Sequence, residues 1–117
     1  MSAIKVHDIL KMRVLVARGT ARRLDEHIAE SIEQDPRVLT LDLAGIDGIA
    51  PSFMDEVLVS IERIRQAQAD SEGLTVVVQN PPTHLSSKFE AVGRGHGLSI
   101  MRGDDGAWII VENKEMS

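Results

Sequence analysis

Two short apolar runs joined by a helical segment constrain the fold more than any other feature of this 117-residue chain. Residues 38–43 and 74–78 consist largely of Val, Leu and Thr, and both lack the length and the period of a helix. Such runs are typical of strands buried on both faces, as in parallel sheets covered by helices. Between them, apolar side chains in residues 54–64 recur at spacings of three and four and predict a long amphipathic helix. A unit of strand, helix and strand places its two strands parallel.

The segment before these runs is expected to add strands and a further helix. Residues 4–10 and 13–17 are rich in aliphatic and β-branched side chains, which predicts two strands or one bent strand. We expect residues 13–17 to join the same sheet as the two central runs. From Thr20, the expected N-cap, apolar residues recur on one side of a helix that Asp35 and Pro36 are expected to end.

The last third of the chain predicts a short helix and then a β-hairpin. Leu85, Phe89 and Val92 share one helical face, and the glycine-rich residues 93–97 are expected to end this helix. A phosphate-binding role is disfavoured, because phosphate-binding glycine loops follow a strand and open a helix. Residues 98–111 then form a terminal hairpin around a Gly-Asp-Asp-Gly turn.

Together these elements predict an α/β fold with a mixed β-sheet, parallel central strands covered by helices, and a terminal β-hairpin. The length of the chain suits one domain. We assign residues 1–112 to that domain and residues 113–117 to a C-terminal tail.

Composition and charge exclude several classes of protein. The chain has no cysteine, which excludes disulfides, thiolate nucleophiles and cysteine-ligated metals. Its first ten residues lack the unbroken apolar core of a signal peptide, and no stretch approaches the ~18 apolar residues of a membrane span. A cytoplasmic location is therefore expected. The net charge of −5, with two phenylalanines, one tryptophan and no tyrosine, argues against nucleic-acid binding.

Residues 41–52 connect the first central run to the long helix and read Leu-Asp-Leu-Ala-Gly-Ile-Asp-Gly-Ile-Ala-Pro-Ser. This segment, within its order of strands and helices, resembles the STAS domain of anti-sigma-factor antagonists. In that family the helix starts with Asp-Ser-Ser-Gly, and a partner kinase can place phosphate on the second serine. Those four positions fall here on Ala50, Pro51, Ser52 and Phe53, so only the phosphorylatable serine matches.

The start of the helix, Ser-Phe-Met-Asp-Glu, is more similar to a divergent STAS-like subgroup in which Ser-Phe-x-Asp-Glu replaces the usual glycine. The resemblance implies a non-enzymatic regulatory module that binds a protein partner, an ATP-binding serine kinase of the anti-sigma type, and is controlled by phosphorylation of Ser52. The residues expected to contact the partner surround this serine: Ile49, Ala50, Pro51, Ser52, Phe53, Asp55 and Glu56. Two alternatives stay open: a module that senses a small ligand or nucleotide, and a constitutive scaffold subunit in which Ser52 is only a helix cap.

Ser52 also has a purely structural interpretation, because serine is a favoured N-cap and Asp55 three residues later approximates a capping box. As a nucleophile, Ser52 would need a base and an orienting acid, for which His84 and Asp47 are the candidates on paper. No Gly-x-Ser-x-Gly surrounds it, so we predict no catalytic residue and no enzyme activity. The histidines lack metal-ligand spacing and Asp104-Asp105 suits a turn, so neither a metal site nor a cofactor is predicted.

Overall fold

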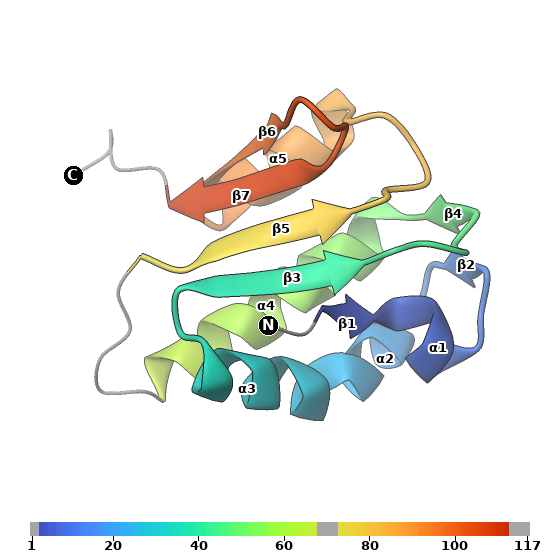
Figure 1. The fold of residues 1–117 in the computed structure, drawn as a ribbon. Coiled ribbons are helices and arrows are strands. Elements are labelled where there is room, and N and C mark those ends of the chain that lie inside the picture. Colours follow the sequence, from blue (N-terminus) through green and yellow to red (C-terminus); the bar gives the residue numbers. More distant parts are fainter. Residues whose placement is uncertain (1–2, 68–72, 113–117) are drawn as a thin grey trace.

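The computed structural model describes residues 3–67 and 73–112 and is organised around a five-stranded sheet with the order β1-β3-β5-β7-β6 (Figure 1). The strands are β1 (Ile4–Lys5), β3 (Val38–Asp42), β5 (Thr75–Gln79), β6 (Leu98–Arg102) and β7 (Trp108–Glu112). The first three are parallel, and β7 pairs antiparallel with both β5 and β6. The α/β fold class, the parallel central strands and the terminal hairpin are therefore confirmed.

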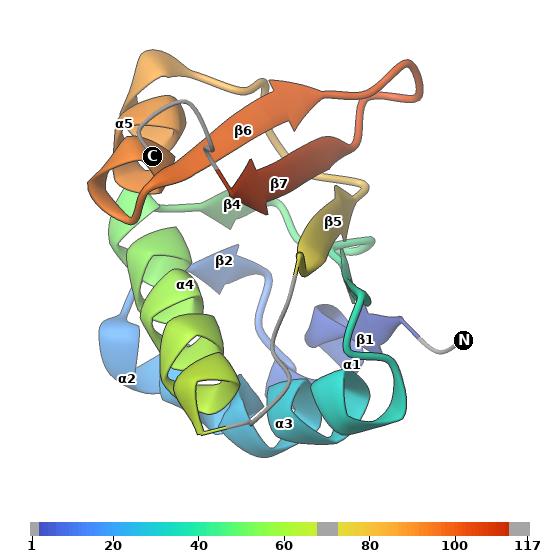
Figure 2. The ribbon, with the colours of Figure 1, turned by 90° about the vertical axis from the view of Figure 1, so that its left-hand side faces the viewer.

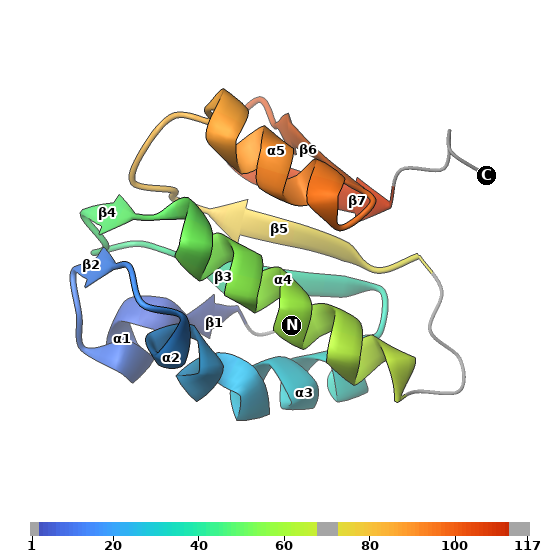
Figure 3. The ribbon, with the colours of Figure 1, turned by 180° about the vertical axis from the view of Figure 1, so that it is seen from behind.

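Three helices cover this sheet. Helix α4 (Pro51–Gln66) connects β3 to β5, as the spacing of apolar residues predicts, and α5 (Ser87–Gly95) connects β5 to β6. Both lie behind the sheet in Figure 1, in front of it in Figure 3 and to one side of it in Figure 2. Helix α3 (Asp25–Gln34) packs against α4 and against β1 and β3.

The strands bury only one of their two faces. In β3 and β5, Leu39, Leu41, Val76 and Val78 are buried against the helices, whereas the alternate side chains are only half-buried or exposed. The expectation that these runs are buried on both faces is therefore wrong. The reason is that α4 and α5 lie on the same side of the sheet, so an unbroken apolar run here marks one buried and one half-buried face.

The N-terminal segment departs from its predicted strands. Only Ile4–Lys5 is extended, and Val6–Leu10 forms the helix α1, since its buried residues Val6 and Leu10 lie one helical turn apart. Strand β2 (Val14–Leu15) does not join the main sheet as expected. It pairs in parallel with β4 (Gly48–Ile49) to make a separate two-stranded sheet.

The helix expected from Thr20 begins earlier and in pieces. Helix α2 (Arg18–Ala21) has Ala17 as its N-cap, and the 3-10 turn η1 (Arg22–Leu24) leads directly into α3. Thr20 lies inside α2, so its prediction as N-cap is wrong. Apolar residues still fall on one side through the three pieces, and Ala21, Leu24, Ile28 and Ile32 are all buried.

The glycine-rich segment ends α5 as predicted. Gly97 adopts a left-handed backbone with φ of 71°, which a residue with a side chain rarely takes. Gly93 is needed for a different reason, because a Cβ added there would lie 2.8 Å from Cγ1 of Ile100. The predicted tail, residues 113–117, lies outside the described residues. Within residues 3–67 and 73–112, no helix is long and apolar enough to cross a membrane.

Candidate functional site

Ser52 lies in the first turn of α4, at the end of the sheet to which the parallel strands point (Figure 1). It is not the N-cap. The cap position belongs to Ala50, and Pro51 takes the first helical position, where its fixed φ and missing N–H are tolerated. The Ser52 hydroxyl instead donates a hydrogen bond of 3.0 Å to the carbonyl oxygen of Val16. This bond ties the start of α4 to the segment that follows β2.

An exposed apolar stripe runs along that same segment. Met12, Val14 and Val16, here called the β2 stripe, are 37%, 53% and 55% exposed, while Leu15 between them is fully buried. Leu15 is the one side chain of this segment that the core takes up, and Arg13, between Met12 and Val14, is exposed as well. Three of the four exposed large apolar side chains of the described residues fall in this short segment, which makes it an unusual surface.

Strand β2 has a single pairing partner among the described residues, which is β4. Only one of its two backbone edges is therefore paired. The carbonyl of Arg13 accepts a hydrogen bond of 2.6 Å from the N–H of Asp47, and the carbonyl of Leu15 accepts one of 2.8 Å from the N–H of Ala50. Successive residues of a strand direct their backbone groups to opposite edges. The N–H and carbonyl groups of Val14 therefore face away from β4, at the outer edge of the two-stranded sheet.

The predicted contact residues divide into two groups. Ile49, Ala50, Pro51 and Ser52 are half-buried and lie beside the β2 stripe, to which the β2–β4 pairing joins them. Phe53 and Met54 would suit a partner anchor only if exposed, and both are 1% exposed. Their side chains belong to the core, as expected for Met54 from its position on the apolar face of the helix.

Asp55 and Glu56 are bound to basic side chains from the preceding helices. Arg18 Nη1 lies 2.5 Å from Oδ2 of Asp55 and 3.6 Å from Oε1 of Glu56, and Arg22 Nε lies 3.2 Å from Oε2 of Glu56. Glu56 is largely buried, so these two arginines compensate a carboxylate that the fold removes from water. Arg18 and Arg22 thus join α2 and η1 to the first turns of α4.

His96, at the C-cap of α5, is bonded through both of its ring nitrogens to carboxylates of α4. Nε2 lies 2.6 Å from Oδ1 of Asp55, and Nδ1 lies 2.8 Å from Oε1 of Glu62. A carboxylate only accepts hydrogen bonds, so the two contacts are satisfied together when both ring nitrogens carry a proton, as in an imidazolium. Burial by itself would lower the pKa of His96, but the bonds and charges of Asp55 and Glu62 raise it above its ordinary value.

The same contacts lower the pKa of Asp55, first through the hydrogen bond from Arg18 and then through the bond from His96. Sequence reasoning considered His96 only as a candidate metal ligand, and it missed this bridge. The one signal for it is the spacing of Asp55 and Glu62, which differ by seven residues and so share a face of α4. Which basic group meets that face depends on how α5 packs, and no local pattern encodes that packing.

The three groups considered for hydrolysis are engaged separately. Ser52 donates to a backbone carbonyl, and Asp47 pairs with Nε of Arg13 at 2.9 Å. Among the described residues, no hydrogen bond joins either of them to His84. Asp105 accepts a bond of 3.1 Å from the N–H of Ala107, in agreement with the predicted turn. No group of three or more metal-ligating side chains comes together in the part of the chain that the structure describes.

Comparison with known proteins gives no assignment. No protein-family model matches the chain, and neither the curated proteins nor the solved structures contain a significant match.

Proposed function

We propose that this chain is a non-enzymatic, cytoplasmic interaction module that docks on a protein partner through the β2 stripe and the first turn of α4. The partner is an ATP-binding serine kinase of the anti-sigma type, as the STAS resemblance of residues 41–56 implies. The observation that carries the proposal is the exposed stripe of Met12, Val14 and Val16 beside the one serine that matches the family's phosphorylated position.

The stripe has the properties of a docking edge. It offers apolar side chains in solvent and, at Val14, backbone groups directed away from the β4 pairing. Proteins commonly cover or charge such edges, because an open edge can pair with another chain. A partner segment that adds to the outer edge of β2 would bury the stripe and satisfy those backbone groups together.

Phosphorylation of Ser52 would act on this edge through the bond to Val16. A phosphate on Oγ removes the hydroxyl proton that the Val16 carbonyl accepts, and it places about two negative charges next to that carbonyl. The start of α4 and the end of the stripe would then repel each other. Docking at the stripe is weakened both by this change of geometry and by the cost of removing the phosphate from water.

Two substitutions at Ser52 separate charge from the loss of the hydrogen bond. Neither alanine nor aspartate can donate to the Val16 carbonyl, so both variants lose that bond, and only aspartate adds charge. We expect Ser52→Asp to weaken partner binding about tenfold or more relative to Ser52→Ala. The measurement is a calorimetric titration of each variant with the serine kinase encoded beside this chain.

A second pair of variants tests the stripe itself. Val14→Asp places a charge on it and should reduce affinity by about tenfold or more. Met101→Asp is the matched control, because Met101 is an equally exposed apolar residue on β6, outside the stripe. Thermal melts check that all four variants remain folded. Equal binding by the wild type, Ser52→Asp and Val14→Asp would reject the docking site and leave Ser52 as a structural residue of a scaffold.

A further inference from the structure

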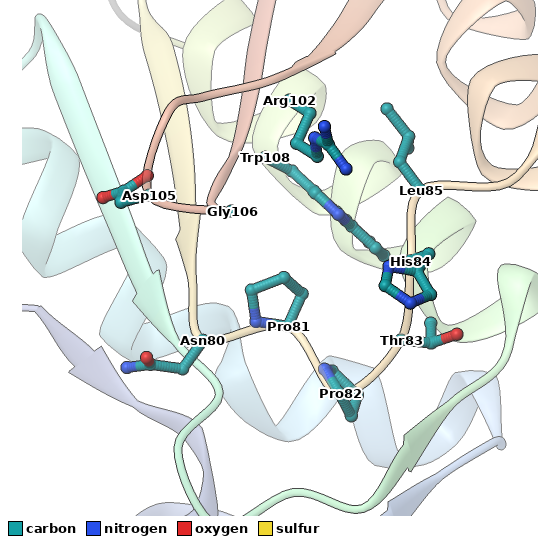
Figure 4. A pocket seen from close by; sticks show the side chains of 10 residues that line it. All are labelled: Asn80, Pro81, Pro82, Thr83, His84, Leu85, Arg102, Asp105, Gly106 and Trp108. Atoms are coloured by element: carbon teal, nitrogen blue, oxygen red, sulfur yellow. The ribbon is translucent and has the colours of Figure 1, made fainter.

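A hollow of about 470 Å³ lies at the C-terminal end of β5, between the loop that leaves this strand and the turn of the β6–β7 hairpin (Figure 4). Its size falls within the range of small-molecule sites. Its place is also informative, because ligands of open α/β sheets bind outside the carboxyl ends of the parallel strands.

Part of the lining of the hollow is apolar. Pro81, Pro82 and Leu85 contribute from the loop, and Trp108 contributes from the start of β7. The Trp108 ring is held in the core, with its centroid 4.8 Å from that of Phe89. Prolines lose little conformational freedom when a ligand packs against them, which favours binding of a flat or compact apolar group.

The lining also includes two exposed basic side chains. Arg102, at the end of β6, and His84, in the loop, flank Trp108 in Figure 4. Within the described residues, neither has a carboxylate within 4.0 Å, whereas five other arginines do: Arg13, Arg18, Arg22, Arg63 and Arg65. Arg102 and His84 therefore form no ion pair with the described residues that would stabilise the fold.

The acidic residue of the lining does not compensate these groups. Asp105 accepts the N–H of Ala107 within the hairpin turn, and in Figure 4 its carboxylate points away from Arg102 and His84. An arginine can bind a carboxylate or a phosphate through two parallel N–H donors, and the histidine ring supplies a further donor.

We propose that this hollow binds a small organic anion, a carboxylate or a phosphate ester with a flat apolar body. Arg102 binds the anionic group with help from His84, and the body packs against Pro81, Pro82 and Leu85, next to the buried edge of Trp108. The site is separate from the docking surface at Ser52, so each of the two proposals stands without the other.

The test uses Trp108, the only tryptophan in a chain without tyrosine, as a fluorescent reporter inside the site. The purified protein is titrated with benzoate, phenyl phosphate, inorganic phosphate and benzyl alcohol, and amide NMR shifts locate the response. We expect saturable binding of benzoate or phenyl phosphate, with shifts around residues 80–85 and 102–108. The stronger of these two identifies the anionic group, and benzyl alcohol and inorganic phosphate should each bind about tenfold more weakly.

Substitutions assign the roles. Arg102→Gln should weaken the better probe about tenfold and His84→Gln about threefold, whereas Arg94→Gln, an exposed arginine on α5 outside the hollow, should leave it unchanged. Because Arg102 and His84 are exposed, the folded state should survive both changes, and melting curves verify this. The proposal is overturned if none of the probes saturates, if benzyl alcohol binds as well as the anions, or if Arg102→Gln binds like the wild type.

Discussion

Two histidines of this chain lie in opposite electrostatic settings. His96 donates from both ring nitrogens to carboxylates of α4, within a chain of charges that we call the α4 cluster: Arg18, Arg22, Asp55, Glu56, Glu62 and His96. His84, beside Arg102, has no carboxylate partner among the described residues. Charges that meet partners from other elements hold those elements together, whereas charges without partners are free to meet a ligand. From this comparison we infer that the α4 cluster stabilises the fold, whereas the basic groups of the hollow bind the proposed anion.

Deleting each histidine is the strongest way to break this comparison. His96→Ala removes a donor from Glu62 and one of the two donors of Asp55, which keeps Arg18, at a site where the ring is only 13% exposed. It should therefore reduce the free energy of unfolding by about 1–2 kcal/mol. His84→Ala should change it by less than about 0.5 kcal/mol, as is usual for an exposed residue. Urea denaturation with a common slope measures both values. Equal losses for the two variants would contradict the comparison.

The α4 cluster also predicts how stability depends on pH. Because the pKa of folded His96 is raised, its stabilising contribution is complete below the unfolded value of about 6.5 and is lost as the pH rises through the folded pKa. The pKa of folded Asp55 is lowered, so its contribution is lost only as the pH falls below 3.8 towards the folded pKa. Wild-type stability should therefore decline above pH 6.5, and His96→Gln should remove that decline. His84→Gln, the control, should retain it in the same series of urea titrations.

Arg18 of the α4 cluster and Arg102 of the hollow should differ in the same direction as the two histidines, with a smaller effect on stability. Arg18→Gln removes a bond to Asp55 and a contact with Glu56, so it should lower the melting temperature slightly and make it less sensitive to salt. Arg102→Gln removes no ion pair of the described residues and should alter neither. Scanning calorimetry at low and high sodium chloride compares them. A larger loss for Arg102→Gln would show that the hollow, too, has a structural role.

Local sequence patterns were sufficient for the central part of the fold. For β3, α4 and β5, the spacing of apolar residues, the segment lengths and the turn residues all indicate the same elements. The parallel pairing of β3 and β5 then follows from their helical connection. The N-terminal strands failed because two-residue pairings such as β1 and β2 carry almost no periodic signal. Their partners, β3 and β4, were decided by long-range packing instead.

The candidate site was predictable in position but not in its contacts. The position of Ser52 near the start of a helix follows from the sequence, yet its cap role was wrong because Pro51 occupies the first helical position. Its actual partner, the Val16 carbonyl, lies 36 residues earlier and becomes adjacent only when β2 pairs with β4. The bridge at His96 was missed for the same reason, since its two carboxylates belong to another helix.

The position of β7 has a consequence for how the protein forms during synthesis. This strand is made after β5 and β6 but lies between them, and it carries Trp108, one of the largest fully buried side chains. A nascent chain that has emerged only through β6 would leave the outer edge of β5 unpaired and the site of the indole unfilled. Open strand edges and unfilled cores promote aggregation. We therefore expect the sheet to stay prone to aggregation until β7 has left the ribosome and paired with β5.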